Sequence, residues 1–298
     1  MQKIKKICSA YENETCVLKL QRDVMRIAGP DAGKYLQGQL TQDVLAMAEG
    51  ESAWSFLLNP DGKVNAWLRI THIGEHKYLL DMDNDFGEVV LARLLRFKLR
   101  TDCELTLEKW EGITIIGKDA SSFAGKPSSE QIAAQTLWPQ ISSVDIIGGD
   151  TKALLERFPE PEQSYDFLRI VNCIPKMGTE LHEKVIPAET GLVEKSVSFT
   201  KGCYTGQELV ARIDSRGNKV PKNLMLVTCQ EGMAIGDEVE VDGFSVGHLT
   251  SVASGSNLTV GLAYIARKAS TASEGKVNGN TVSINLRQNT FAPRERIG

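Results

Sequence analysis

The sequence has no long apolar run, and this excludes a membrane-spanning helix. Its 298 residues are 42% hydrophobic and 24% charged, as in ordinary globular proteins, and no stretch approaches the ~18 apolar residues that a membrane helix requires. The first residues are basic, as in a signal peptide, but the polar segment from Cys8 to Glu14 follows where an apolar core should be. We therefore expect a cytoplasmic protein without membrane contact.

Motifs for metal binding and for disulfide scaffolds are also missing. The six cysteines are widely spaced and never form Cys-x-x-Cys, so neither a zinc knuckle nor a disulfide scaffold is predicted. None of the four histidines lies in a His-Glu-x-x-His arrangement. His72 and His76 are four apart, but Gly74 lies between two strand-like runs and favours a hairpin. We predict reduced thiols and no metal site.

A strong charge of either sign is absent as well. Thirty-four basic and 38 acidic residues give a formal net charge of −4, so the whole chain has no general attraction for nucleic acid or anionic lipid. One local exception runs from Lys201 to Lys222, where five basic side chains stand against two acidic ones. Strong direct binding of RNA is therefore not expected.

What the sequence does contain is a mixed pattern followed by a purely β pattern. Strands are predicted at 17–27, 52–58, 64–73, 77–82, 103–107 and 113–117, and helices at 29–40 and 85–97, the second capped by Asp85. This mixture predicts an α+β domain. After Pro221 only short β runs follow, with the hairpin turns Asp242-Gly243 and Asn278-Gly279. We predict a domain over residues 1–221 and a small all-β domain over residues 222–298.

The segment Lys201-Gly202-Cys203-Tyr204-Thr205-Gly206-Gln207-Glu208 is the most informative part of the chain. Thr205 and Glu208 have the spacing of a capping box, and apolar residues continue the helix that it would begin. Cys203 precedes this helix start, with Lys201 nearby, so it would lie in a positive potential that favours the thiolate. The two glycines let the backbone bend and let other molecules approach. We predict an exposed, reactive loop.

This octapeptide resembles the signature Lys-Gly-Cys-Tyr-x-Gly-Gln-Glu of the YgfZ family, a branch of the glycine-cleavage T-protein superfamily. All seven specified positions match: Lys201, Gly202, Cys203, Tyr204, Gly206, Gln207 and Glu208. Other segments resemble the family in the same order along nearly the whole chain. They are Tyr35 to Val44, Asn59 to Val64, Ile186 to Leu192 and Gly261 to Tyr264.

The resemblance implies a fold and a function. The fold would be a T-protein-like folate-binding body with ferredoxin-like elements, a C-terminal β-barrel and a central folate pocket. The function would be that of a folate-binding accessory protein for iron–sulfur cluster assembly or repair and, through an iron–sulfur enzyme, for thiomethylation of transfer RNA. The implied cofactor is tetrahydrofolate or a derivative, and the implied partners are iron–sulfur proteins or their assembly factors. A single cysteine cannot complete the usual four-thiolate site, so any cluster would be shared or transient.

The resemblance also implies ligand residues. Glu189 matches the position whose carboxylate holds the pterin, since two parallel N–H donors suit a bidentate acceptor; a surface loop charge is the alternative. Tyr165 stands where relatives can carry an aromatic ring that stacks on folate, and a core aromatic is the alternative. In the basic patch, Lys201 and Arg212 are expected to receive the carboxylates of a polyglutamyl folate tail in preference to RNA phosphates, although such patches are most often solvated faces.

One departure from the superfamily bears on the reaction. True aminomethyltransferases carry an aspartate where this sequence has Ala66, so no carboxylate is expected there to stabilise a cationic amine or to steer a proton. Cys203 is then the candidate catalytic group. Two alternatives stay open. One is a folate-dependent aminomethyl- or methyltransferase with an unknown acceptor, using Cys203 or Glu189; the other is a folate-sensing or storage module with an inert thiol.

Overall fold

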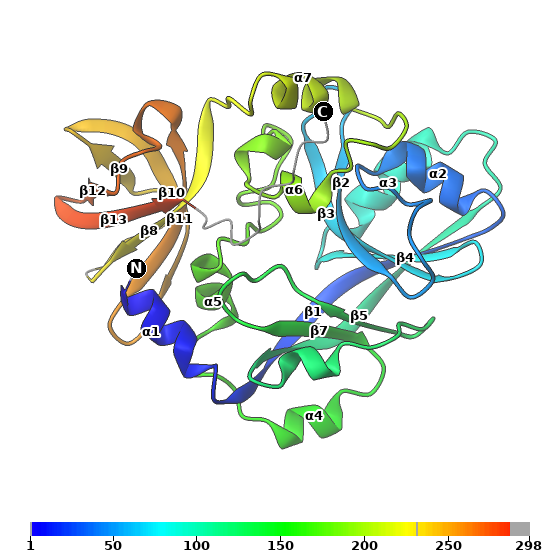
Figure 1. Cartoon of the computed structure of the whole chain (residues 1–298), viewed down its shortest axis with the longest axis horizontal. Coiled ribbons are helices and arrows are strands. Elements are labelled where there is room, and N and C mark those ends of the chain that lie inside the picture. Colours follow the sequence, from blue (N-terminus) through cyan, green and yellow to red (C-terminus); the bar gives the residue numbers. More distant parts are fainter. Residues whose placement is uncertain (1, 231, 287–298) are drawn as a thin grey trace.

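A seven-stranded antiparallel sheet forms the body of the protein (Figure 1). The computed structural model describes residues 2–230 and 232–286. The strands of the sheet follow the order β2-β3-β4-β1-β5-β7-β6. Their bounds are β1 Thr15–Ala28, β2 Ser52–Leu58, β3 Val64–Gly74, β4 Lys77–Asp83, β5 Glu104–Gly117, β6 Gln131–Gln135 and β7 Ser143–Gly148.

The long strand β1 organises this sheet because it pairs with two neighbours. Its residues Arg22 to Ala28 pair with β4, and its whole length from Thr15 to Ala28 pairs with β5. Two separate strands were expected at 103–107 and 113–117, whereas β5 is one continuous strand. Pairing with β1 supplies backbone partners across the polar stretch that local pattern alone could not assign to a strand.

Short helices cover the sheet and connect it to the rest of the chain. They are α1 Gln2–Ala10, α2 Ala32–Gln39, α3 Gly87–Phe97, α4 Lys152–Arg157, α5 Tyr165–Val171, α6 Val193–Ser196 and α7 Gln207–Ser215, with single turns η1 Ala120–Phe123, η2 Pro187–Glu189 and η3 Arg267–Ala269. The predicted cap of α3 is wrong. Asp85 has a positive φ of 70° and is exposed, and the Gly87 N–H instead donates to Asp23 Oδ2 of β1 at 2.7 Å.

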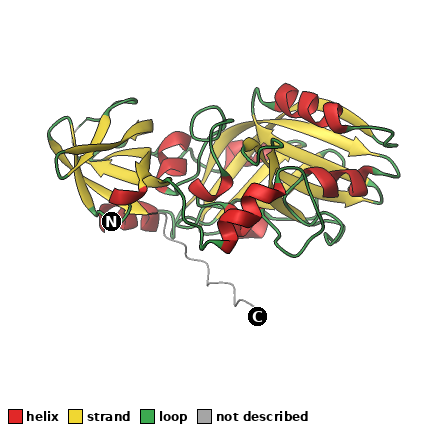
Figure 2. Cartoon of the chain, turned by 90° about the horizontal axis from the view of Figure 1, so that it is seen from above, coloured by secondary structure: helices red, strands yellow, loops and turns green. Residues whose placement is uncertain are grey.

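A closed six-stranded barrel forms the second part of the molecule (Figure 2), which confirms the predicted all-β architecture. Its strands are β8 Lys222–Cys229, β9 Glu238–Val241, β10 Phe244–Ser254, β11 Thr259–Ala266, β12 Glu274–Val277 and β13 Asn280–Leu286. Both predicted hairpin turns form with positive φ at each central residue, as at Asn278 (50°) and Gly279 (80°). Residues 287–298 of the predicted second domain lie outside the described residues.

Body and barrel share one hydrophobic core. Leu224, Leu226 and Leu262 of the barrel belong to the same cluster of buried side chains as Phe167 and Leu168 of α5. A separate cluster, which includes Val227 and Ile284, fills the barrel interior. None of the helices within residues 2–230 and 232–286 is long and apolar enough to cross a membrane.

Candidate functional site

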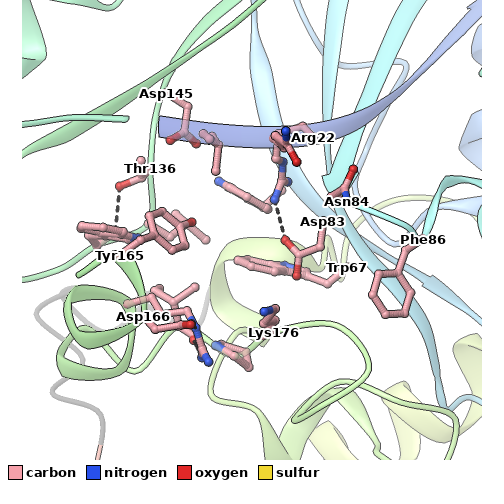
Figure 3. Close-up of a pocket in the computed structure, with 18 of the residues that line it drawn as sticks. Arg22, Trp67, Asp83, Asn84, Phe86, Thr136, Asp145, Tyr165, Asp166 and Lys176 are labelled. Carbon is pink, nitrogen blue, oxygen red and sulfur yellow. Dashed lines mark hydrogen bonds and ion pairs between the residues drawn. The ribbon is translucent and has the colours of Figure 1, made fainter. Parts of the chain in front are cut away.

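A cavity of about 480 Å³ opens where β1, the end of β4 and helix α5 converge (Figure 3). Its wall also includes the segments 136–138 and 174–176. Five aromatic side chains line it: Trp54, Trp67, Phe86, Trp138 and Tyr165. Cavities of this size with aromatic walls and a few polar groups are typical of sites for organic ligands.

The aromatic rings form two groups on different sides of the cavity. Trp54 and Trp67 stack with ring centroids 4.0 Å apart and an interplanar angle of 18°. Trp138 and Tyr165 meet at 5.6 Å with a tilt of 55°, and Figure 3 shows Tyr165 across the cavity from Trp67. Flat walls of this kind suit a planar, conjugated ligand.

A network of arginines and aspartates supports one wall of the cavity, which Arg22, Asp83 and Asp145 line. Arg22 pairs with Asp81 at 3.0 Å and with Asp83 at 2.6 Å. Arg69 pairs with Asp81 at 2.8 Å and with Asp145 at 3.2 Å. Burial acts to lower the pKa of Arg22, but Asp81 and Asp83 outweigh it and the pKa is raised. Because every member has an opposite charge close by, the network holds the wall in one arrangement.

Two ionisable groups in this wall have pKa values raised by burial. The pKa of Asp145 is raised by burial although Arg69 opposes the effect. Burial also raises the pKa of Tyr165, and the Asp145 carboxylate adds to this. Tyr165 therefore keeps its hydroxyl proton at neutral pH and can donate a hydrogen bond to a ligand. Lys176 is exposed at the cavity, where Figure 3 shows it below Trp67.

The octapeptide lies outside the wall of this cavity, in the loop before α7. Cys203 is exposed, whereas the other five cysteines are buried, which confirms the predicted exposed loop. Gly206, with φ at 83°, is the N-cap of α7, and a Cβ on it would lie 2.6 Å from the Asn59 carbonyl oxygen. Only glycine fits this position without strain.

The predicted capping box does not form. Because the N-cap is Gly206, Thr205 lies one residue too early, and its hydroxyl is 3.5 Å from the Gly38 carbonyl oxygen of α2. Gln207 closes the turn instead, since its side-chain oxygen accepts from the Tyr204 N–H at 3.3 Å. The pattern Thr-x-x-Glu was a misleading signal here because the positive φ of Gly206 decides where the helix begins.

A chain of hydrogen bonds connects the cavity wall to this loop. Trp67 Nε1 donates to Ser196 Oγ at 2.9 Å, and Thr41 Oγ1 donates to the Ser196 carbonyl at 2.6 Å. The Ser198 N–H then donates to the Thr41 carbonyl at 2.9 Å. Thr41 directly follows the C-terminal end of α2, so this end of the helix supports both the aromatic wall and the start of the loop.

Comparisons with known proteins agree with this fold. No family model matches the chain. Aminomethyltransferase T of the glycine cleavage system from Bartonella henselae superimposes with a TM-score of 0.77 at 15% identity, over 97% of this chain and 89% of that one. An uncharacterized protein of Haemophilus influenzae is 29% identical over 224 residues, which is 74% of this chain and 76% of that protein.

Other relatives have functional names. The tRNA-modifying protein YgfZ of Vibrio vulnificus is 27% identical over 211 residues, covering 65% of this chain and 64% of that protein. The chain is thus similar to the YgfZ family. The mitochondrial iron-sulfur cluster assembly factor IBA57 homolog of Neurospora crassa is 26% identical over 250 residues, covering 74% of this chain but only 55% of that protein. The chain thus spans less than two thirds of the length of these named relatives.

In this chain, Glu189 and Tyr165 do not line the same cavity. Tyr165 lines the cavity, but Glu189 does not. Glu189 is 5% exposed, and one of its oxygens lies 3.4 Å from the Ile186 N–H. Burial raises its pKa, and Lys222 of the barrel opposes this rise. Glu189 therefore lies outside the wall of this cavity, and its role as a pterin ligand stays a prediction.

Lys201 and Arg212 also lie away from the cavity wall. Arg212 is exposed on α7. The Lys201 ammonium is buried and donates to three backbone carbonyls, those of Gln37, Leu40 and Gln42, at 2.6, 2.7 and 2.8 Å. All three of its N–H donors are used, so Lys201 has none left for a folate carboxylate.

Ala66, where true aminomethyltransferases carry an aspartate, also lies outside this cavity. Ala66 is buried in β3 and does not line the cavity, so its identity does not decide which charges the cavity contains. Four carboxylates lie in the wall: Asp83, Asp85, Asp145 and Asp166. The cavity therefore contains groups that could stabilise a cation.

Sequence reasoning missed most of the residues that build this wall. Trp54, Trp67 and Arg22 had been read only as parts of strands. One signal was present in the sequence: Arg22 and Asp23 interrupt the apolar pattern of a long predicted strand. Charges within such a strand mark a buried network or a site more often than a solvent face.

Proposed function

We propose that the protein binds a reduced folate in the aromatic cavity and supports iron–sulfur cluster assembly or repair in the cytoplasm through Cys203. By way of an iron–sulfur enzyme, this activity would support modification of transfer RNA. The observation that carries the proposal is the aromatic cavity with a charged wall, in a T-protein-like fold. The names of the relatives point the same way, since one is called a tRNA-modifying protein and another an iron-sulfur cluster assembly factor.

The residues of the cavity fit a folate. A pterin is flat and carries N–H donors at one edge, and the cavity offers aromatic faces together with the carboxylates of Asp83 and Asp145. Tyr165 would orient the ring with its face and its protonated hydroxyl. Bound folate would supply a carrier of one-carbon units, while the chain itself supplies the pocket and the exposed thiol.

Equilibrium binding tests the pocket. Tetrahydrofolate is titrated into the wild type, Tyr165→Ala and Glu189→Ala. Tyr165→Ala should weaken binding roughly fivefold, since an aromatic contact of this kind is worth on the order of 1 kcal/mol. Glu189→Ala should bind within about twofold of the wild type, because Glu189 lies outside the wall. If only Glu189→Ala lost affinity, the ligand would occupy a different site.

Complementation tests the role of the thiol. Cells that lack the native gene receive the wild type or Cys203→Ser, and iron–sulfur enzyme activity and transfer RNA thiomethylation are measured. Loss of both with Cys203→Ser is expected, because a serine hydroxyl neither ligates iron comparably nor exchanges sulfur. Full activity of Cys203→Ser would end the proposal. If the protein turned over methylene-tetrahydrofolate with amine or thiol acceptors, the function would instead be that of a one-carbon transferase.

A further inference from the structure

The ammonium of Lys201, two residues before Cys203, binds the C-terminal end of helix α2. Lys201 is 9% exposed. Its ammonium donates to the carbonyls of Gln37, Leu40 and Gln42 at 2.6, 2.7 and 2.8 Å. Gln37 lies in the last turn of α2 and Leu40 is its C-cap. The last carbonyls of a helix lack intrahelical partners and carry partial negative charge, so a cation there is doubly favourable.

The loop is fastened to the same helix end on the other side of the thiol. The Thr205 N–H donates to the Gly38 carbonyl at 3.0 Å. Tyr204 is buried, and its ring centroid lies 5.2 Å from the Lys201 ammonium. Between these two anchors only Gly202 and Cys203 are exposed. The backbone is therefore bound to α2 at Lys201 and again at Thr205, with the exposed Cys203 between these two contacts.

We propose that Lys201 is the positioning residue for Cys203, acting as a C-terminal cap of α2 that fixes the loop, and not as a cation that activates the thiol. This rests on the proposed function in one respect, that Cys203 is the working group. The geometry favours it because all three ammonium donors already have carbonyl acceptors. A charge used in this way attracts the helix end and leaves no hydrogen bond for a thiolate.

Few ionisable groups face this ammonium. Asp43, from the segment after α2, is the charge that attracts it, and Tyr204 comes from its own loop. Burial lowers the pKa of Lys201 to about 8, against the attraction of Asp43. Burial raises the pKa of Tyr204 to about 12, so Tyr204 stays neutral at physiological pH.

The test uses the full chain and a nitroxide attached to Cys203. Attachment is selective because the other five cysteines are buried. The variants are Lys201→Met, which removes the donors, and Lys219→Met, which removes an exposed positive charge after α7 and serves as the matched control. Lys201→Gln keeps two N–H donors without the charge, and it replaces Lys201→Met if that variant fails to fold. The nitroxide spectrum is recorded well below the unfolding temperature, where a change in global stability does not alter it.

The expected result is a loop released from α2. Nitroxide motion should become at least about threefold faster in Lys201→Met and remain as in the wild type in Lys219→Met. Exchange of the Thr205 amide hydrogen should accelerate at least about tenfold, the factor implied by loss of one charge-assisted hydrogen bond. On unlabelled protein, the midpoint of the pH profile of Cys203 alkylation by iodoacetamide should stay within about 0.3 of the wild type, a shift too small for a lost ion pair.

Unchanged nitroxide motion and unchanged Thr205 exchange in Lys201→Met and Lys201→Gln would overturn the proposal. The proposal would also be overturned if the midpoint of the alkylation profile rose by about one pH unit or more while nitroxide motion stayed unchanged. Lys201 would then act on the thiolate through its charge. These measurements need neither folate nor an iron–sulfur enzyme. The proposed function fails separately, if Cys203→Ser complements fully while the loop measurements still behave as expected.

Discussion

At the scale of single residues, burial separates the side chains that hold the structure from those that can react. Cys203 is exposed, and the other five cysteines are buried. Burial raises the pKa of Cys8 to about 11 and also raises that of Cys16. Accessibility therefore directs thiol chemistry to Cys203, and the raised pKa values of Cys8 and Cys16 further disfavour their nucleophilic thiolate forms.

We therefore predict that a thiol reagent modifies a single cysteine in the folded protein. Reaction with a chromogenic disulfide at pH 7.5 should give one rapid equivalent, and guanidinium should release the remainder of the six cysteines. Cys203→Ser is the control and should abolish the rapid phase. A second rapid equivalent in that variant would mean that another cysteine is accessible in the folded state.

Glu189 should make stability depend on pH in a defined direction. Burial raises its pKa above the ordinary 4.5, so the folded state binds the proton more tightly than the unfolded state does. The resulting stabilisation is complete below pH 4.5 and is lost as the pH rises through the folded-state pKa. Relative to Glu189→Gln, a neutral mimic, the free energy of unfolding of the wild type should therefore fall across this window.

Chemical denaturation of both proteins between about pH 4.5 and 7.5 measures this difference. Other ionisable groups affect the two proteins alike, so the difference isolates Glu189. Parallel curves for the wild type and Glu189→Gln would show that this carboxyl has the same pKa in both states. A rising difference would show that a favourable charge partner, such as Lys222, outweighs its burial.

At the scale of elements, side chains from distant strands and loops complete the helix ends. Asp23 of β1 caps α3, and Lys201 caps the C-terminal end of α2. In each case the partner is far away in sequence. A sheet or a loop that packs against a helix can satisfy its free backbone groups as well as a local cap does.

Asp23→Ala should destabilise the protein by about 1 kcal/mol, the usual cost of losing an N-terminal cap. Asp85→Ala is the matched control. Asp85 is the residue that local sequence favours, but its side chain makes exposed contacts, an ion pair with Lys109 and a hydrogen bond from the Asn84 amide, and exposed contacts of this kind contribute little. Guanidinium denaturation gives both values. If Asp85→Ala lowered the free energy of unfolding as much as Asp23→Ala or more, Asp85 would be the cap of α3.

At the scale of the whole molecule, a buried carboxylate joins the body to the barrel. Glu180 is fully buried and accepts from Ser251 Oγ at 2.6 Å and Thr250 Oγ1 at 2.7 Å, both on β10. Arg169 of α5 lies 3.6 Å from its other oxygen and donates to Ser251 Oγ at 2.9 Å. The barrel is thus attached through both a shared apolar core and a polar network.

Glu180→Ala should cost about 3 to 5 kcal/mol, because it leaves Arg169 buried without its buried partner. Asp166→Ala is the matched control, since Asp166 also pairs with Arg169 but its side chain is 52% exposed. It should cost about 1 kcal/mol or less. Thermal unfolding followed by circular dichroism, with guanidinium titration for the magnitudes, separates the two. If both variants lost similar free energy of unfolding, the buried Glu180 would matter to Arg169 no more than the exposed Asp166 does.

The sequence by itself determined the features that depend on local pattern. The strand 52–58, the all-β end of the chain, and the turns at Asp242-Gly243 and Asn278-Gly279 could be predicted because alternation and turn chemistry act over a few residues. The exposed loop of Cys203 could be predicted from the octapeptide. The family could be recognised from that octapeptide together with segments in matching order.

Tertiary structure alone decided which distant residues meet. It built the cavity from Arg22, Trp54, Trp67 and Tyr165, which lie on separate elements, and it left Glu189 outside. It also directed Lys201 toward carbonyls of α2 instead of the neighbouring thiol. The physical reason is common to all of these: burial, ion pairing and the completion of helix ends depend on partners that sheet pairing brings together from distant parts of the chain. Proximity along the sequence indicates where a charge is, and only the fold decides what it contacts.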